Sequence, residues 1–393
     1  SKEEVEVNFD VVQRESLSAF GNGDLLVEKL ILNPRHIEVQ ILADNYGNIY
    51  TLADRDCSIQ RRHQKVIEEA PATNINLEVR EGMAFQAKQV AKSISYSGAE
   101  TIEFLLEKNN FYFMEMNTRL QVEHPVTELI LGLDLVELQI RVANNEKIIL
   151  DYNKDSIKGH AIEARVYAEI PEKNFQPSPG KILEFNFPDK PYLRLDTGYL
   201  ANDEVSSYYD PMIAKIISYG VNRDDAIKKL SFALENTRLE GIKNNIDFLN
   251  KIIKVSAFAE KKINTDFINK FWKKLISSKE SKDLLLDSAA ALYIKFRSSY
   301  YISKSLSPWH NNINWRHLGN DFENISLIYD KEVFNYEVKI LNPSEFLVID
   351  EERKNKNIFK ILNDDFSKKL SLIRNNKKIE NIYFTVNNDN IYI

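Results

Sequence analysis

The chain has 393 residues, of which 43% are hydrophobic and 28% are charged, and its formal net charge is −6. This much apolar material supplies cores for one large or two to three ordinary domains and excludes a disordered chain. The mild acidity gives no reason to expect a nucleic-acid or membrane-surface partner. A single cysteine, Cys57, excludes an intramolecular disulfide and a thiolate cluster for zinc, which suits a reducing compartment.

No apolar run reaches the roughly 18 residues that suggest a membrane-spanning helix. The first residues also lack the basic, apolar and small-residue order of a signal peptide. We therefore expect a soluble protein. The chain begins Ser-Lys-Glu-Glu instead of with methionine, which leaves a removed leader or a preceding domain open.

In chain order, the first elements are a helix over residues 11–20, ended by Gly21-Asn22-Gly23, and then a strand over 25–32. Strands at 36–42 and 49–53 flank an Asn/Gly turn and form a hairpin. Apolar residues at spacings of three and four predict a helix over 77–94.

A second hairpin pairs residues 101–106 with 111–116. Asp134 followed by Glu137 is typical of a helix N-terminus. Further patterns predict a mostly antiparallel sheet and two helices, with strands at 159–169, 181–187, 193–196 and 212–219 and helices at 223–236 and 245–253. After residue 275, a helix at 283–297 and many short strands predict a separate β-rich domain.

The second hairpin carries candidate chemistry. With a three-residue loop at 108–110, Glu103 lies opposite Glu115, and alternation puts Asn117 on the face of Glu115. An extended continuation would add Arg119, Gln121 and Glu123 to that face. Two carboxylates and an amide oxygen are hard ligands suited to Mg²⁺. The alternative is a solvated edge strand, but two opposed carboxylates need a cation between them.

Three other features have weaker signals. The run Gln60-Arg61-Arg62-His63-Gln64-Lys65 offers donors for phosphates or bicarbonate, or is a solvated loop. The segment 28–31 could pair its backbone with an adenine edge, or be an ordinary buried strand. His36 could be a satisfied buried histidine, and Arg165 a strand arginine paired with Glu163 or Glu169.

The string Glu115-Met116-Asn117-Thr118-Arg119-Leu120-Gln121-Val122-Glu123-His124-Pro125-Val126-Thr127-Glu128 closely resembles the signature of the biotin carboxylases, which belong to the ATP-grasp superfamily. The resemblance spans roughly residues 5–270. It is also carried by the strings at residues 33–40, 55–65, 159–165 and 177–182.

The resemblance implies an α+β fold. Its parts would be the C-terminal part of an ATP-grasp fold, a biotin carboxylase C-terminal domain and a small β-rich domain. The expected division is residues 1–29 as a remnant of the ATP-grasp lid subdomain, 30–275 as the core with the C-terminal domain, and 276–393 as a subunit-docking domain.

The implied activity is that of an ATP-dependent ligase, which carboxylates biotin with bicarbonate through carboxyphosphate. By resemblance, Glu103 and Glu115 ligate Mg²⁺ or Mn²⁺, with Asn117 on a second ion, and Glu123 is the general base. Arg119, Lys65 and the Val122 backbone, with Gln121 beside them, resemble the bicarbonate clamp, and Arg165 resembles the cation that stabilises the biotin enolate. The implied ATP contacts are Glu28, Lys29, Leu30, Ile31, His36, Gln60, His63, Glu103 and Glu115.

Partners also follow from the resemblance. The strings at 263–268, 307–310 and 315–316 are similar to the α-subunits of 3-methylcrotonoyl-CoA and geranyl-CoA carboxylases. In such subunits the β-rich region docks a carboxyltransferase β-subunit, and the assembly is an oligomer. Propionyl-CoA and acetyl-CoA carboxylases remain alternatives. The expected compartment is the cytoplasm, or the mitochondrial matrix in a eukaryote.

Some expected parts do not occur in the sequence. The family's N-terminal nucleotide-fold domain, Gly-rich loop and two ATP-binding lysines would precede residue 1, and no biotinyl-lysine motif is present, so biotin is expected on a separate carrier domain. We therefore expect this chain alone to bind ATP weakly or not at all. Two alternatives remain: a carbamoyl-phosphate-type ATP-grasp enzyme, against which the 61–65 and 123–128 strings argue, and an inactive assembly module.

Overall fold

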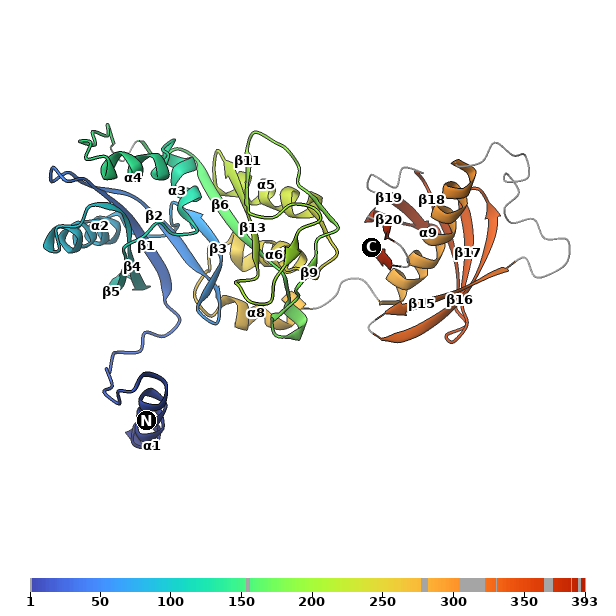
Figure 1. The fold of residues 1–393 in the computed structure, drawn as a ribbon, viewed down its shortest axis with the longest axis horizontal. Coiled ribbons are helices and arrows are strands. Elements are labelled where there is room, and N and C mark those ends of the chain that lie inside the picture. Colours follow the sequence, from blue (N-terminus) through green and yellow to red (C-terminus); the bar gives the residue numbers. More distant parts are fainter. Residues whose placement is uncertain are drawn as a thin grey trace. The chain divides into compact units, whose positions relative to one another are not determined.

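The computed structural model describes residues 2–152, 156–276, 282–303, 322–329, 331–363, 370–382, 384–387 and 390–392. The chain forms two compact units, Ser1–Leu275 and Ile276–Ile393 (Figure 1). In the described residues, no helix is long and apolar enough to cross a membrane. The strings at 307–310 and 315–316 lie outside the described residues.

The N-terminal region differs from the prediction at two places. Helix α1 (Lys2–Phe20) begins nine residues before the expected 11–20. The strand predicted over 25–32 is wrong, because that segment joins no ladder, and Leu26 and Val27 are more than four-fifths exposed. The following strand, β1, is already bonded on both sides, to β2 and β4, so its edges offer no place for another strand.

The first unit is built on one eight-stranded sheet in which every ladder is antiparallel. Only antiparallel pairs allow the tight hairpin connections that join β2 to β3 and β4 to β5. The strand order is β11 (Leu193–Thr197), β13 (Met212–Gly220), β6 (His160–Tyr167), β3 (Gln64–Ala70), β2 (Ile49–Arg61), β1 (Arg35–Ala43), β4 (Gly98–Glu107) and β5 (Asn110–Asn117).

One face of strands β1 and β4 packs on helix α2 (Leu77–Ser93), as Figure 1 shows. Ile37, Ile102 and Phe104 meet Met83 and Ala87 of the helix there, which is the apolar stripe that predicted the helix. Because strand side chains alternate, the polar residues between them point to the other face. That face carries the candidate site.

Helices α3 (His124–Leu131) and α4 (Leu135–Ala143) follow β5 and pack on the sheet's other face. Val126 and Ile130 of α3 are buried against Ala161 of β6 and Ile217 of β13. The predicted N-cap of α4 is confirmed, because the Asp134 side chain accepts a hydrogen bond from the Glu137 N–H at 2.8 Å.

The remainder of the first unit covers β6 and β13 with helices. The predicted helix over 223–236 is confirmed, and the one over 245–253 is displaced by one residue. The strand expected over 181–187 is divided into two short strands in different sheets. The elements are η2 (Pro171–Lys173), α5 (Arg223–Asn236), α6 (Ile246–Lys254), α7 (Ser256–Ala259), α8 (Phe267–Ile276), β7 (Glu169–Ile170), β8 (Gln176–Pro177), β9 (Gly180–Lys181), β10 (Glu184–Asn186), β12 (Glu204–Val205) and β14 (Arg238–Glu240).

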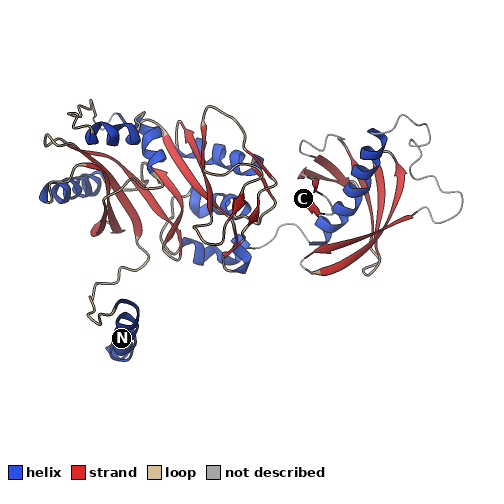
Figure 2. Cartoon of the chain, in the orientation of Figure 1, coloured by secondary structure: helices blue, strands red, loops and turns tan. Residues whose placement is uncertain are grey.

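The second unit is an antiparallel six-stranded sheet packed on one helix, α9 (Lys282–Ser303) (Figure 2). Leu286, Ala290 and Ile294 of α9 lie in one core with Val338 and Phe359 of the sheet. The β-rich character expected after residue 275 is therefore confirmed. The strands are β15 (Phe322–Tyr329), β16 (Glu332–Asn342), β17 (Glu345–Asp350), β18 (Lys356–Ile361), β19 (Leu370–Arg374) and β20 (Lys377–Ile382), with β21 (Thr385–Asn387) and β22 (Asn390–Tyr392) paired separately.

Candidate active site

The hairpin β4–β5 places Glu103 directly opposite Glu115, as predicted, but by a different route. The loop has two residues, not three, because Glu107 pairs with Asn110 and Phe104 with Phe113. A regular ladder would then set Glu103 opposite Met114. Met114 is instead an extra residue on β5, and this bulge restores the Glu103–Glu115 pairing.

Asn117 bridges these two carboxylates. Its Nδ2 lies 3.0 Å from Oε1 of Glu103 and 3.0 Å from Oε1 of Glu115. Both carboxylate oxygens therefore face the same atom, Nδ2 of Asn117, and lie close to each other. Glu103 is buried, whereas Glu115 is exposed, so one side of this group is open to a ligand.

The hairpin formed by β2 and β3 supplies a cation to the site. Arg62 and His63 form its two-residue turn, and both have positive φ, as type I′ turns require. The run from Gln60 to Lys65 is thus a tight turn and the strand ends beside it, not an extended donor loop. One extra residue on β3 between Lys65 and Ile67 shifts the register, so Lys65 and Glu68 share a face.

The Lys65 ammonium lies among three carboxylates. Its Nζ is 2.6 Å from Oε2 of Glu38, 2.8 Å from Oε1 of Glu103 and 2.6 Å from Oε1 of Glu123. Burial favours the neutral form of Glu103, but the contact with His36 and the charge of Lys65 outweigh it and lower the pKa of Glu103 to about 2. Lys65 is therefore the cation that makes this acidic cluster possible.

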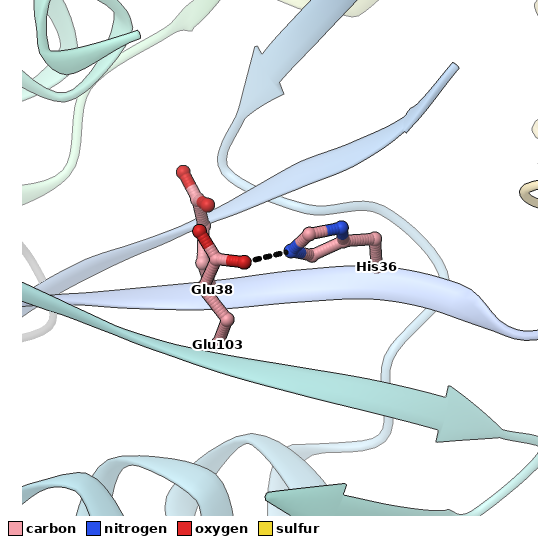
Figure 3. A group of neighbouring side chains, drawn as sticks. All are labelled: His36, Glu38 and Glu103. Atoms are coloured by element: carbon pink, nitrogen blue, oxygen red, sulfur yellow. Dashed lines mark ion pairs between the residues drawn. The ribbon is translucent and has the colours of Figure 1, made fainter. Parts of the chain in front are cut away.

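His36 adds a ring nitrogen donor to the cluster, and Figure 3 shows the ring facing Glu103. Its Nδ1 is 2.6 Å from Nε2 of Gln60, and its Nε2 is 2.7 Å from Oε2 of Glu103. An amide nitrogen only donates, so Nδ1 accepts and the ring proton faces Glu103. His36, Glu38 and Glu103 each bring a potential ligand atom within 4.8 Å of the others. Arg55 and Lys65 already occupy both oxygens of Glu38, so we interpret this group as an ion-pair network.

Sequence reasoning missed the structural importance of Arg55 and Glu38. Arg55 is fully buried, and its Nε donates to Oε1 of Glu38 at 2.5 Å. Its two Nη groups also donate to Gln40, Thr101, Gln121 and Thr127. For Glu38, the available signal was that polar residues alternate with apolar ones along β1. Arg55 thereby fixes Gln121, which donates to Glu103 at 2.6 Å.

Arg165 faces Glu123 from the neighbouring strand β6. Its Nη2 lies 2.9 Å from Oε2 of Glu123, and its Nε lies 2.6 Å from Oε1 of Glu68. The sequence alternative that paired Arg165 with Glu163 or Glu169 is wrong. Glu169 pairs with Arg61 instead. Glu163 lies on the same face of β6 as Arg165, but its carboxylate makes no hydrogen bond to Arg165. Both oxygens of Glu123 are thus held by cations, Lys65 and Arg165.

The residues after β5 do not continue the strand as predicted, because the ladder ends at Asn117. Arg119 is exposed and donates to the Leu120 carbonyl at 3.3 Å, and no carboxylate pairs with it in the part of the chain that the structure describes. Gln121 and Glu123 turn inward and are buried. Lys215 of β13 anchors this segment by donating to the Val122 carbonyl at 2.8 Å.

All but one of the predicted site residues line one open pocket of ≈ 860 Å³. Thr265, Asp266 and Asn269 close one side of it, and they were not predicted. Glu28 alone among the predicted site residues does not line it. The predicted residues that do are Lys29, Leu30, Ile31, His36, Gln60, His63, Lys65, Glu103, Glu115, Asn117, Arg119, Gln121, Val122, Glu123 and Arg165.

The chemistry of Glu103, Glu115 and Asn117 fits a divalent cation with oxygen ligands. Two carboxylate oxygens converge on one point, and the amide that bridges them can present Oδ1 there after a half-turn. Glu115 is exposed and able to meet an incoming metal–nucleotide complex. These residues would hold Mg²⁺ together with a phosphate ligand.

Comparisons with known proteins identify the relatives of this chain. Residues 1–150 match the carbamoyl-phosphate synthase L chain ATP-binding domain, and residues 163–270 match the biotin carboxylase C-terminal domain. The chain is 44% identical over 299 residues to the α subunit of methylcrotonoyl-CoA carboxylase from Rattus norvegicus. That match covers 75% of this chain and 42% of the rat protein. It is 44% identical over 315 residues to the human propionyl-CoA carboxylase α chain, covering 78% and 43%.

A solved structure is also similar. The biotin carboxylase domain of the Hydrogenobacter thermophilus 2-oxoglutarate carboxylase, in complex with MgADP, ADP and bicarbonate, has a TM-score of 0.66 and 41% identity. The match covers 71% of this chain and 62% of that one. The chain spans less than half the length of the two curated relatives. Residues 1–270 of this chain therefore belong to the biotin carboxylase family, as an ATP-grasp domain followed by the biotin carboxylase C-terminal domain.

Proposed function

We propose that this protein uses ATP and bicarbonate to carboxylate biotin, as the biotin carboxylase component of an acyl-CoA carboxylase. One observation carries the proposal: Glu123, held between Lys65 and Arg165, shares a pocket with the oxygen ligands Glu103 and Glu115. A base flanked by cations, beside a metal–phosphate site, is what a reaction between two anions needs.

In the first half-reaction, Lys65 and Arg119 hold the bicarbonate anion with the Val122 backbone and Gln121. Glu123 accepts the bicarbonate proton, and the resulting oxygen attacks the γ-phosphorus of ATP. The bond from phosphorus to the β-phosphate oxygen breaks, so ADP leaves and carboxyphosphate forms. Fixing a poor nucleophile in line with its target is the main contribution of such a clamp.

The nucleotide lies along the opposite side of the pocket in this proposal. Lys29, Leu30 and Ile31 provide the adenine contact, together with Glu28, which stands outside the pocket lining. His36, Gln60 and His63 contact the nucleotide nearby. A metal ion held by Glu103, Glu115 and Asn117 would neutralise charge on the transferring phosphoryl group.

In the second half-reaction, carboxyphosphate breaks into CO₂ and phosphate. The phosphate takes the proton from N1 of biotin, and Arg165 stabilises the enolate-like oxygen that results. N1 then attacks CO₂ and forms carboxybiotin. Arg165 is buried except where it lines the pocket, so solvent screens its charge less than that of an exposed arginine.

We also propose partner proteins, a final acceptor and a cellular compartment. Biotin would reside on a separate carrier domain, and the second unit would dock a carboxyltransferase β-subunit within an oligomer. Residues 1–29 would form part of the ATP-grasp lid subdomain. The names of the rat and human relatives support either 3-methylcrotonoyl-CoA or propionyl-CoA as the final acceptor, and we favour the former. Several relatives are named as mitochondrial, which supports the mitochondrial matrix if the protein is eukaryotic. For a bacterial protein we propose the cytoplasm.

The test is fixation of radiolabelled bicarbonate into biotin, with ATP and Mg²⁺, by the carboxylase holoenzyme that contains this chain, because the chain alone is expected to bind ATP weakly or not at all. Glu123→Gln should lower the rate by about 10²–10⁴-fold, the range for loss of a general base. Glu137→Gln, at an exposed position of α4, is the control and should change nothing. ATP-dependent fixation that is equal in both variants would exclude Glu123 as the base.

A further inference from the structure

Two carboxylates that the proposed mechanism does not use face each other beneath the site. Glu68 of β3 and Glu163 of β6 are cross-strand partners, and both side chains are fully buried. Directly opposed residues have Cβ atoms about 5 Å apart and share a face of the sheet. Two ionised carboxylates in this position would repel each other strongly.

Hydrogen bonding around the pair is incomplete. Glu68 uses Oε1 for the Nε of Arg165, but its Oε2 has no hydrogen-bond partner in the described part of the chain. Neither oxygen of Glu163 has a partner among the described residues. A buried polar group left without a hydrogen-bond partner is strongly unfavourable, and an ionised carboxylate is more unfavourable than a neutral group. Three neighbouring acceptor oxygens with no donor between them indicate a missing proton.

The cations nearby are engaged elsewhere. Arg165, two residues beyond Glu163 on the same face of β6, binds Glu68 and Glu123. Lys215 of β13 donates to the Val122 carbonyl and pairs with Asp196. Helix α3 covers this part of the sheet with Val126 and Ile130. The charged groups that face Glu163 are therefore Glu68 from β3, Lys215 from β13, Arg165 from β6 and Glu123 from the segment before α3.

We propose that Glu163 is a positioning residue that stays protonated and donates its O–H to Oε2 of Glu68, which fixes Glu68 as the carboxylate that orients Arg165. This rests on the proposed role of Arg165 toward biotin. Burial supports it, because it raises the pKa of Glu163 well above its ordinary value, and the charge of Glu68 acts in the same direction. Burial also raises the pKa of Glu68 to about 7 against the pull of Arg165, so the pair holds at least one proton at neutral pH.

The consequence is a chain of contacts from Glu163 through Glu68 to Arg165 and Glu123. An ionised Glu163 would compete with Glu123 and Glu68 for the Arg165 guanidinium. A protonated Glu163 instead completes the hydrogen bonding of Glu68 and leaves Nη2 of Arg165 on Glu123. The orientation of the guanidinium at the pocket then depends on a residue outside the pocket lining.

The kinetic test compares Glu163→Gln with Glu163→Leu. The amide of Gln supplies an N–H in place of the O–H, so kcat for biotin carboxylation should stay within about threefold of the parent protein. Leu supplies no donor, so kcat/KM for biotin should fall about tenfold or more, while bicarbonate-dependent ATP hydrolysis without biotin should stay within about twofold. A matched control is Glu100→Leu, because Glu100 is equally buried and unpartnered but lies on the α2 face of β4.

A Leu variant as active toward biotin as the parent would overturn the proposal, and so would a Gln variant as impaired as Leu. Infrared spectroscopy tests the proton without relying on activity. The C=O stretch of a protonated carboxylic acid should be present at pH 8 and should change in Glu163→Gln, and its persistence unchanged would also overturn the proposal. If the parent protein fixes no bicarbonate, the proposed function fails, whereas the infrared result still decides the protonation of Glu163.

Discussion

Glu103 and Glu115 lie directly opposite each other across the hairpin β4–β5 because Met114 is an extra residue in the second strand. Without that bulge, Glu115 would pair with Ile102 and point toward helix α2. The register shift therefore turns an exposed carboxylate toward the site.

Glu115→Ala should weaken binding of MgADP about tenfold or more, equivalent to about 1.4 kcal/mol, because one metal ligand is lost. Binding of ADP without Mg²⁺ should change little. Isothermal titration calorimetry of the variant and of Glu137→Ala, an exposed control on α4, measures both affinities. An equal loss for ADP with and without Mg²⁺ would contradict a role in metal binding.

Lys65→Met should destabilise the first unit by about 3–5 kcal/mol, the usual cost of leaving a buried charge unpaired. Glu103 is the carboxylate most affected, since Arg55 still pairs with Glu38 and Arg165 with Glu123. Urea unfolding of the variant measures the loss. Adding Glu103→Gln to Lys65→Met should restore part of the stability, and simple additivity of the two changes would refute the coupling.

Acid should destabilise the first unit through Glu38 and Glu103. Each pKa falls to about 2 in the fold, from an ordinary value of 4.5. Arg55 and Lys65 overcome the effect of burial on Glu38, and His36 and Lys65 overcome it on Glu103. Because the folded pKa is the lower one, this stabilisation is complete above pH 4.5 and is lost as the pH falls toward 2. Unfolding free energies measured across this window should fall less steeply in Glu103→Gln than in the parent protein.

Glu100 should have the opposite effect. It is buried with both carboxylate oxygens unpartnered in the described part of the chain, and burial raises its pKa to about 8. Because the folded pKa is the higher one, stability is greatest below pH 4.5 and falls as the pH rises toward 8. Glu100→Gln should be more stable than the parent at pH 8 by about 1–3 kcal/mol. Parallel urea curves at pH 5 and pH 8 measure it, and an identical pH slope in both proteins would exclude the effect.

Much of the fold could be predicted because its signals are local. The apolar stripe with Met83 and Ala87 predicted α2, and Asp134 with Glu137 marked the start of α4. The strand expected over 25–32 failed for a nonlocal reason: its residues favour a strand, but β1, the next strand along the chain, is already paired on both sides, and the segment joins no ladder.

The sequence by itself determined the family and most residues of the candidate site, because motif strings and side-chain alternation are properties of neighbours along the chain. Only the tertiary structure decided which charges pair. Lys65 meets Glu38, Glu103 and Glu123 from three other segments, and Arg165 binds Glu68 in place of Glu163. Such pairings depend on register shifts and on burial, which change the free energy of each charge only after distant strands have come together.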